Sequence, residues 1–242
     1  MIKKYFLILV LIITSCTDEN VLNNEEEIIE EIVVEEVIIE ENSDGQDGEE
    51  IPCVNGFAGN YPCKDYDLLL RIPLERMGTG TIAGNDSWGW VDTTTAKEYA
   101  LMGTTQGVTF VDITNPSEAI ILGTLKTNTV NIVWRDIKVH NNIAYIVSEA
   151  TAHGMQLFDL TKLRNVQNPP VNFTADSQYN GFREAHNIVI NETSGFAYAV
   201  GTKTFAGGPH FVNINTPLSP VAAGGFAAGG YSHDAQVVSY TG

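Results

Sequence analysis

Apolar and polar side chains alternate along most of residues 88–242, in short runs that Asn, Gly and Pro residues separate. This two-residue period is typical of strands, because successive side chains of a strand point to opposite faces. In the clearest stretch, a turn at Asn141–Asn142 separates predicted strands, and these lie at 137–139, 144–147, 155–158 and, as a short outer strand, near 171–173. No stretch has the period of a helix of ordinary length, so the pattern predicts an all-β body.

The strand pattern is repeated along the chain. Three segments close a strand on an Asp or Asn and then turn: GVTFVDITNP, GMQLFDLTKL and PHFVNINTPL, which close on Asp112, Asp159 and Asn213. A second pattern recurs upstream of each, and aligning its copies equates four positions, Trp90, Asp136, Asn187 and Asp234, at steps of 46, 51 and 47 residues. A period of about 40 to 50 residues with several short strands per unit is typical of β-propeller blades.

Residues 88–242 contain about three such units and the start of a fourth, which opens with SHDAQVVSYTG. Closed propellers have about four to eight blades. We therefore expect a partial propeller in a C-terminally incomplete fragment, with assembly onto another chain or an open array as alternatives. A β-sandwich is the other architecture considered, although sandwiches do not require internal similarity at a fixed period.

The N-terminus has the pattern of a secretory signal. Residues 1–15 place two lysines before a short apolar run, and small and polar residues then lead to Cys16. The run is too short for a permanent transmembrane helix, which needs about 20 residues. The ITSC ending is similar to the lipobox of bacterial lipoproteins, so we expect cleavage before Cys16 and lipidation of its thiol. The alternative is a simple cleaved signal with an incidental cysteine.

The negative charge is concentrated just after this signal. Of a formal net charge of −17, residues 17–50 contribute 15 acidic side chains and no Lys or Arg. Within residues 25–41 glutamate pairs recur every five residues, a period that keeps to no single face of a helix or strand. We interpret 16–51 as a lipidated cysteine and an acidic low-complexity tether, with a local helix as the alternative. The remaining chain has no basic stripe, which argues against nucleic-acid binding.

Two further cysteines lie in the segment 52–87, which leads into the repeats. Cys53 and Cys63 bracket the loop VNGFAGNYP, whose Gly, Asn and Pro residues allow its ends to meet. If Cys16 carries lipid, these two are free to form a disulfide in an exported protein. A zinc site is the weaker alternative, because no second Cys or His pair lies nearby.

About residues 52–242 resemble the choice-of-anchor B family, exported bacterial proteins related to LVIVD-repeat propellers. The resemblance rests on four motifs: CVNGFAGNYPCKDYDLL, WRDIKVHNNIAYIVSEATAHGMQLFDL, FREAHNIVINETSGFAYAVG and YSHDAQVV. It implies a propeller-like fold and an envelope location without an established catalytic activity. We thus expect a membrane-anchored lipoprotein of the bacterial envelope at the outer membrane, and the acidic residues after Cys16 favour display on the cell surface.

Polar residues at the start of the repeats are the candidate site. In a propeller they would converge at one end of the central channel, and they comprise Asp136, Asn187 and Asp234, with His186 and His233 beside two of them. Carboxylate and amide oxygens in a ring could bind Ca²⁺, and this would suit a metal-dependent hydrolase of the lactonase or esterase type. The alternative, which we favour, is that these side chains satisfy backbone groups at turns. We therefore expect a binding module for a protein, glycan or small molecule, with no catalytic residue or cofactor assigned.

Overall fold

The computed structural model describes residues 50–240. The predicted signal peptide (1–15), Cys16 and nearly all of the tether fall outside these residues. Contacts divide the chain into Met1–Ile39 and Glu40–Gly242, and all that follows concerns the second unit. Between residues 50 and 240, no helix is both long enough and apolar enough to cross a membrane.

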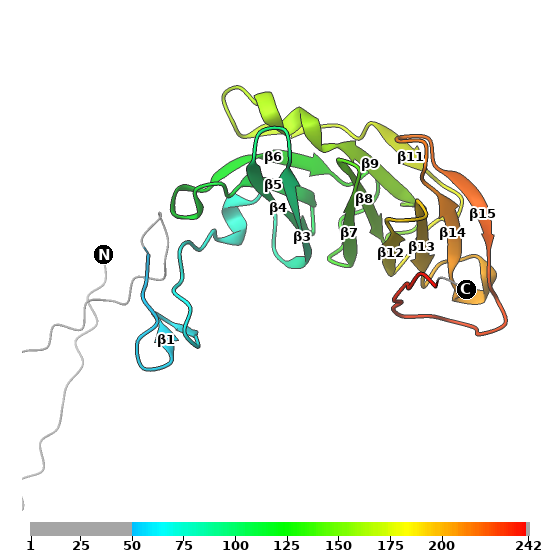
Figure 1. The fold of residues 1–242 in the computed structure, drawn as a ribbon, viewed down its shortest axis with the longest axis horizontal. Helices are drawn as coiled ribbons and strands as arrows, with labels where there is room; N and C mark the ends of the chain where they lie inside the picture. The colour runs from blue at the N-terminus through cyan, green and yellow to red at the C-terminus, as the bar shows by residue number, and fades with distance from the viewer. Residues whose placement is uncertain (1–49, 241–242) are drawn as a thin grey trace, which may run out of the picture. The chain divides into compact units, whose positions relative to one another are not determined.

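The described residues form a small hairpin and three larger sheets, which confirms the all-β prediction (Figure 1). The hairpin pairs β1 (Phe57–Ala58) with β2 (Tyr61–Pro62). The first sheet has the order β10–β6–β5–β4–β3, with strands β3 (Gly84–Asp92), β4 (Lys97–Thr104), β5 (Gly107–Asp112), β6 (Ile120–Lys126) and β10 (Val171–Phe173).

The second sheet has the order β11–β9–β8–β7, with strands β7 (Arg135–His140), β8 (Ile143–Ser148), β9 (Met155–Asp159) and β11 (Ser177–Tyr179). The third runs β12–β13–β14–β15, with strands β12 (Asn187–Asn191), β13 (Phe196–Val200), β14 (His210–Asn213) and β15 (Val221–Gly225). The helical segments of the described chain are short 3-10 turns: η2 (Leu74–Arg76), η3 (Pro116–Glu118), η4 (Leu160–Asn165) and η5 (Phe205–Gly207).

The residues that close the repeated strands each fold a local turn. The side-chain Oδ1 of Asp112 accepts the Thr114 amide at 3.1 Å, and that of Asp159 accepts the Thr161 amide at 2.9 Å. Asn213 repeats the contact with the amide two residues further on, at 2.9 Å. A short side chain that bonds its own backbone two residues on stabilises a turn without any distant partner. This is why the motif recurs at the same place in all three sheets.

One predicted strand belongs to a different sheet from the one expected. The segment 171–173 is a strand, but β10 pairs in parallel with β6 of the first sheet, and β11 is the outer strand of the second. Phe173 packs edge-on against Phe110 and Phe158, rings of the first and second sheets. Gly123 permits the close pairing, because a Cβ there would lie 2.1 Å from the Val171 carbonyl oxygen.

Both faces of the second sheet are buried. On β8, Ala144 and Ile146 join an apolar cluster with Trp90, Leu101 and Phe110 of the first sheet. Their neighbours Tyr145 and Val147 join a second cluster, which contains Ile188, Ala197 and Val212 of the third sheet. Because alternate residues of a strand face opposite ways, one strand supplies two cores. The three sheets therefore pack face to face in chain order.

The strands β3, β7 and β12 lie side by side at one edge of this stack (Figure 1). Trp90 on β3 donates from its indole nitrogen to the Asn142 side chain, at the turn between β7 and β8, at 3.1 Å. Arg164, on η4, donates two hydrogen bonds of 2.7 and 2.8 Å to the buried Asp92 carboxylate at the end of β3. Polar links of this kind fix how the first two sheets sit against each other.

The fourth copy of the repeat does not form a strand within the described residues. Residues 231–240 have no regular secondary structure, although Asn191 of β12 donates to Ser239 at 3.0 Å. A strand needs a hydrogen-bonded neighbour, and no described segment pairs with this one.

The predicted disulfide is confirmed. Cys53 and Cys63 are bonded with their Cα atoms 5.9 Å apart. The bond closes the loop that carries β1 and β2.

Candidate functional site

A recess of about 310 Å³ opens where β3, β7 and β12 begin. It is lined by Asn85, Asp86, Trp134, Arg135, Asp136, His186 and Asn187. Three of the five residues in the predicted ring, Asp136, Asn187 and His186, are therefore brought together. The ring of His233 lies 4.0 Å from that of His186. Asp234 is exposed and bonds the amide of its own neighbour Ala235, so it does not join the recess.

The Asp136 carboxylate binds groups from two sheets. One oxygen accepts the Ile188 amide of β12 at 2.7 Å, and the other accepts the Ile137 amide at 2.9 Å and the Lys138 ammonium at 2.5 Å. The residue is only 4% exposed. Its acceptor capacity is thus largely occupied, and the bond to Ile188 holds β7 against β12.

Asp86 makes the equivalent contact one sheet earlier. Its Oδ2 accepts the Ile137 amide of β7 at 2.9 Å, just as Asp136 accepts the Ile188 amide. The sequence alignment that equated Trp90 with Asp136 is therefore wrong by four residues. An irregularity in the pairing of β3 between Gly84 and Ser87 displaces the alternation there. The available signal was the spacing, since Asp86, Asp136 and Asn187 are 50 and 51 residues apart.

The environment of Asp136, which includes the neighbouring Asp86, raises its pKa. Burial and the adjacent Asp86 carboxyl raise the pKa of Asp136 to about 7, although Lys138 and the Ile188 amide act in the opposite direction. Lys138 also lies 3.6 Å from Asp86 and 4.5 Å from the centre of the Trp88 ring. Lys138 thus contacts the carboxylates of both Asp86 and Asp136, and its ammonium lies over the face of the Trp88 ring.

Two polar groups of the recess residues lack partners. The Asn187 Oδ1 atom is buried without a hydrogen bond in the described structure. Arg135 is 1% exposed, its Nε donates to the Thr104 carbonyl at 3.3 Å, and both terminal nitrogens lack partners among residues 50–240. Burial lowers the pKa of Arg135 to about 10, while burial and this charge lower the pKa of the nearby His153 to about 3. Arg135 is thus a buried cation beside a neutral histidine.

Trp134 and His186 form the accessible wall of the recess. Trp134 is 53% exposed, and its ring centre lies 6.5 Å from that of His186. His186 Nδ1 lies 2.5 Å from Glu149, on the loop after β8. This carboxylate orients the imidazole, while the indole presents a flat apolar surface. Trp134 is a site residue that the sequence reasoning missed, because it precedes the repeat positions that were aligned.

The part of the chain that the structure describes contains no cluster of side chains arranged to bind a metal ion. Between residues 50 and 240, no group of three or more His, Cys, Asp or Glu side chains is placed to hold a metal ion. The oxygens of Asp136 are already bonded to amides and an ammonium group. The Ca²⁺ site remains a prediction from the sequence.

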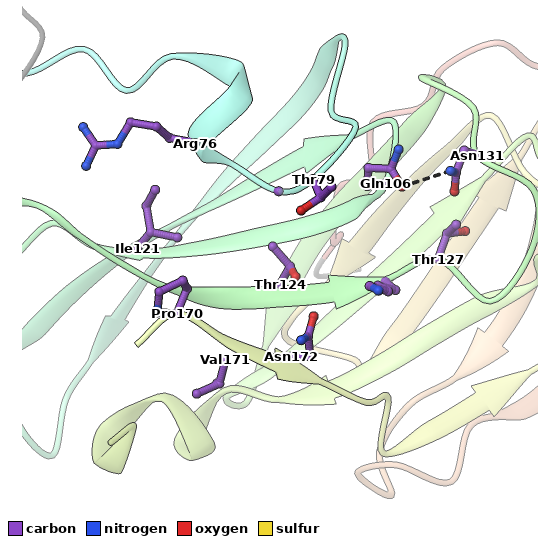
Figure 2. A pocket seen from close by; sticks show the side chains of 12 residues that line it. Arg76, Thr79, Gln106, Ile121, Thr124, Thr127, Asn131, Pro170, Val171 and Asn172 are labelled. Carbon is purple, nitrogen blue, oxygen red and sulfur yellow. Dashed lines mark hydrogen bonds between the residues drawn. The ribbon is translucent and has the colours of Figure 1, made fainter. Parts of the chain in front are cut away.

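A second, larger cavity of about 590 Å³ lies against the first sheet (Figure 2). Its lining comes from the segment around η2, the β4–β5 turn, β6 and the loop after it, and β10. The sequence pattern does not reveal this cavity, because it places residues 171–173 in the second sheet, whereas β10 pairs with β6 of the first. No local pattern marks residues that meet only through such a pairing.

Comparison of the chain with protein-family models, with curated proteins and with solved structures finds no match. We therefore infer the function from the geometry of these two cavities and from the sequence patterns.

Proposed function

We propose that this chain is an exported, lipid-anchored protein of the bacterial cell envelope whose β-propeller-like body is a non-catalytic binding module. The body would contact its ligand at the recess of Trp134, His186 and Asn187, and Cys16 would carry the lipid. In this proposal the carboxylates of Asp86 and Asp136 hold the sheets together, while the accessible side chains contact the ligand.

The observation that carries this proposal is the repeated bond from a carboxylate to the next sheet. Asp86 and Asp136 each accept the amide of a residue near the start of the first strand of the next sheet, Ile137 of β7 and Ile188 of β12. Groups occupied in this way support the architecture and are poorly placed to bind a metal ion or take up a substrate proton. The exposed indole of Trp134 and the imidazole of His186 remain available to a ligand, and rigid aromatic groups are favoured in binding sites.

The same bond supports the propeller interpretation. Three sheets follow one another in chain order, each with its first long strand beside that of its neighbour. We infer that these sheets are successive blades and that β3, β7 and β12 are the innermost strands. The resemblance to choice-of-anchor B proteins agrees with this inference.

Export is supported by the disulfide and by the N-terminal pattern. A Cys53–Cys63 bond persists in oxidising compartments, outside the reducing cytoplasm. The anchor is tested by expressing the full chain with a labelled fatty acid in a Gram-negative host. We expect label in the wild-type protein and none in Cys16→Ser; a labelled Cys16→Ser protein would remove the anchor from the proposal.

The binding module is tested by Trp134→Ala in the purified full chain, screened against soluble oligosaccharides and peptides. We expect at least one saturable ligand whose affinity Trp134→Ala lowers about tenfold. Tyr66→Ala is the matched control, because it removes another exposed aromatic ring outside the recess. Equal affinities in both variants would place the ligand elsewhere on the body.

The contact between His186 and Glu149 favours a second candidate, a hydrolase of the esterase or lactonase type. A carboxylate that orients a histidine is part of a general-base arrangement, although within residues 50–240 no Ser, Thr or Cys side chain bonds to His186. Aryl-ester and lactone hydrolysis, measured with and without added Ca²⁺, distinguishes the candidates. Turnover that His186→Gln abolishes would establish the hydrolase and overturn the non-catalytic role.

A further inference from the structure

The larger cavity lies on the face of the first sheet opposite to its apolar core. Leu125 of β6 belongs to the core shared with the second sheet. Its neighbours Thr124 and Lys126 therefore point to the other face, where they line the cavity. Asn172 of β10 lies directly beside Thr124 in the parallel pairing. The floor of the cavity is thus a polar sheet surface.

The walls are held by contacts within the protein. The Gln106 side chain donates to the Gly80 carbonyl at 2.8 Å and accepts from Asn131 at 2.9 Å, as the dashed line in Figure 2 marks. Thr109 of β5 donates to the Met77 carbonyl at 2.5 Å, which ties the segment after η2 to the sheet. These bonds are made within the protein itself, which reduces the cost of ordering the walls when a ligand binds.

The floor, by contrast, carries polar groups with unused hydrogen-bonding capacity. Within the described chain, the side chains of Thr124, Lys126 and Asn172 make no hydrogen bond or ion pair. Among the described lining residues the charged side chains, Arg76 and Lys126, are both cationic, in a chain of net charge −17. The Lys126 ammonium and the neutral polar groups beside it favour an anionic ligand that also offers hydroxyl groups.

Size and composition restrict the ligand further. The volume of about 590 Å³ is within the range of cavities that bind small organic ligands and far exceeds that of a single inorganic ion. None of the described lining residues is aromatic, so there is no ring on which a nucleobase could stack. We propose that this cavity binds an acidic oligosaccharide, with Lys126 paired to a carboxylate or sulfate and with Thr124 and Asn172 bonded to sugar hydroxyls.

The test uses isothermal titration calorimetry on the purified full chain with a carboxylated oligogalacturonate, a sulfated chondroitin oligosaccharide and a neutral maltooligosaccharide. We expect saturable binding of at least one acidic sugar, weakened by added salt, and none of the neutral one. Lys126→Gln should lower that affinity about tenfold, and Asn172→Ala should lower it without changing the salt dependence. Lys64→Gln is the matched control, because it removes another exposed lysine that lies outside the cavity.

Several outcomes would overturn the assignment: no binding of either acidic sugar, equal binding of the neutral one, or equal affinities in Lys126→Gln and Lys64→Gln. Competition by inorganic sulfate or by oligoglutamate as strong as that by the sugars would show a simple anion or peptide site instead. Loss of acidic-sugar binding in Trp134→Ala but not in Lys126→Gln would move the ligand to the other recess. That last result would reject this cavity while keeping the proposed binding module.

Discussion

The Asp136 carboxylate accepts the backbone amide of Ile188 at 2.7 Å, and this bond joins the first strand of one sheet to the first strand of the next. Asp86 makes the same bond to Ile137. Separate sheets do not share a backbone hydrogen-bonding ladder. Here an aspartate side chain links each sheet to the next. Asp136, which the sequence places in a ligand ring, therefore joins two sheets of the scaffold.

Removing the Asp136 carboxylate should destabilise the fold. Asp136→Ala leaves the buried Ile188 amide and the Lys138 ammonium without this partner, and we expect a loss of about 3 kcal/mol in the free energy of unfolding. Asp234→Ala is the control, since Asp234 is exposed and bonds the adjacent amide; its effect should stay within about 0.5 kcal/mol. Urea denaturation measures both. Equal losses in the two variants would contradict the scaffold role of Asp136.

The raised pKa of Asp136 predicts a specific dependence on pH. The folded-state pKa of about 7 exceeds the ordinary value of 3.8, so folding favours the protonated carboxyl. The resulting destabilisation is fully present above pH 7 and disappears as the pH falls towards 4. As the pH falls from 7 to 4, the free energy of unfolding of wild type should therefore rise relative to that of Asp136→Asn by about 1 kcal/mol per pH unit. Parallel pH profiles of the two proteins would refute the assignment.

The pairing of β10 with β6 should depend on Gly123. An added Cβ would meet the Val171 carbonyl oxygen at 2.1 Å, so Gly123→Ala should displace β10 and cost about 2 kcal/mol. Gly89→Ala on β3 has no atom within 4 Å of the new Cβ and should be nearly neutral. Thermal unfolding compares the two. Similar melting temperatures for both variants would show that β10 does not pack as described.

The buried Arg135 should be dispensable for folding. Its Nε bonds the Thr104 carbonyl, but its terminal nitrogens have no described partner, and a buried charge with so few partners is unfavourable. Replacement by Met keeps most of the volume, and we expect Arg135→Met to raise the free energy of unfolding by about 1 kcal/mol. Chemical denaturation tests this expectation. A loss of stability instead would show that the guanidinium binds a group such as an ordered water or an anion.

Interactions between residues close in the chain allow strands, turns and the disulfide to be predicted from the sequence. The alternation around Asn141–Asn142 predicted strands close to β7, β8 and β9, because side-chain periodicity reflects burial of strand faces. The repeated pattern predicts Asp112, Asp159 and Asn213 as strand-closing residues, and in the structure each bonds an amide two residues away. Cys53 and Cys63 could be paired because a short loop joins them.

Only the tertiary structure decided the contacts between distant segments. It assigned β10 to the first sheet, where Phe173 packs edge-on against Phe110 and Phe158, and it identified Asp86 as the counterpart of Asp136. Neither follows from a local pattern, since an irregular strand shifts the alternation and a three-residue strand can pair with any open edge of suitable shape. The sequence by itself determined the strands, the turns and the disulfide, which depend on near neighbours; packing between sheets determined the cavities, because their walls come from segments far apart in the chain.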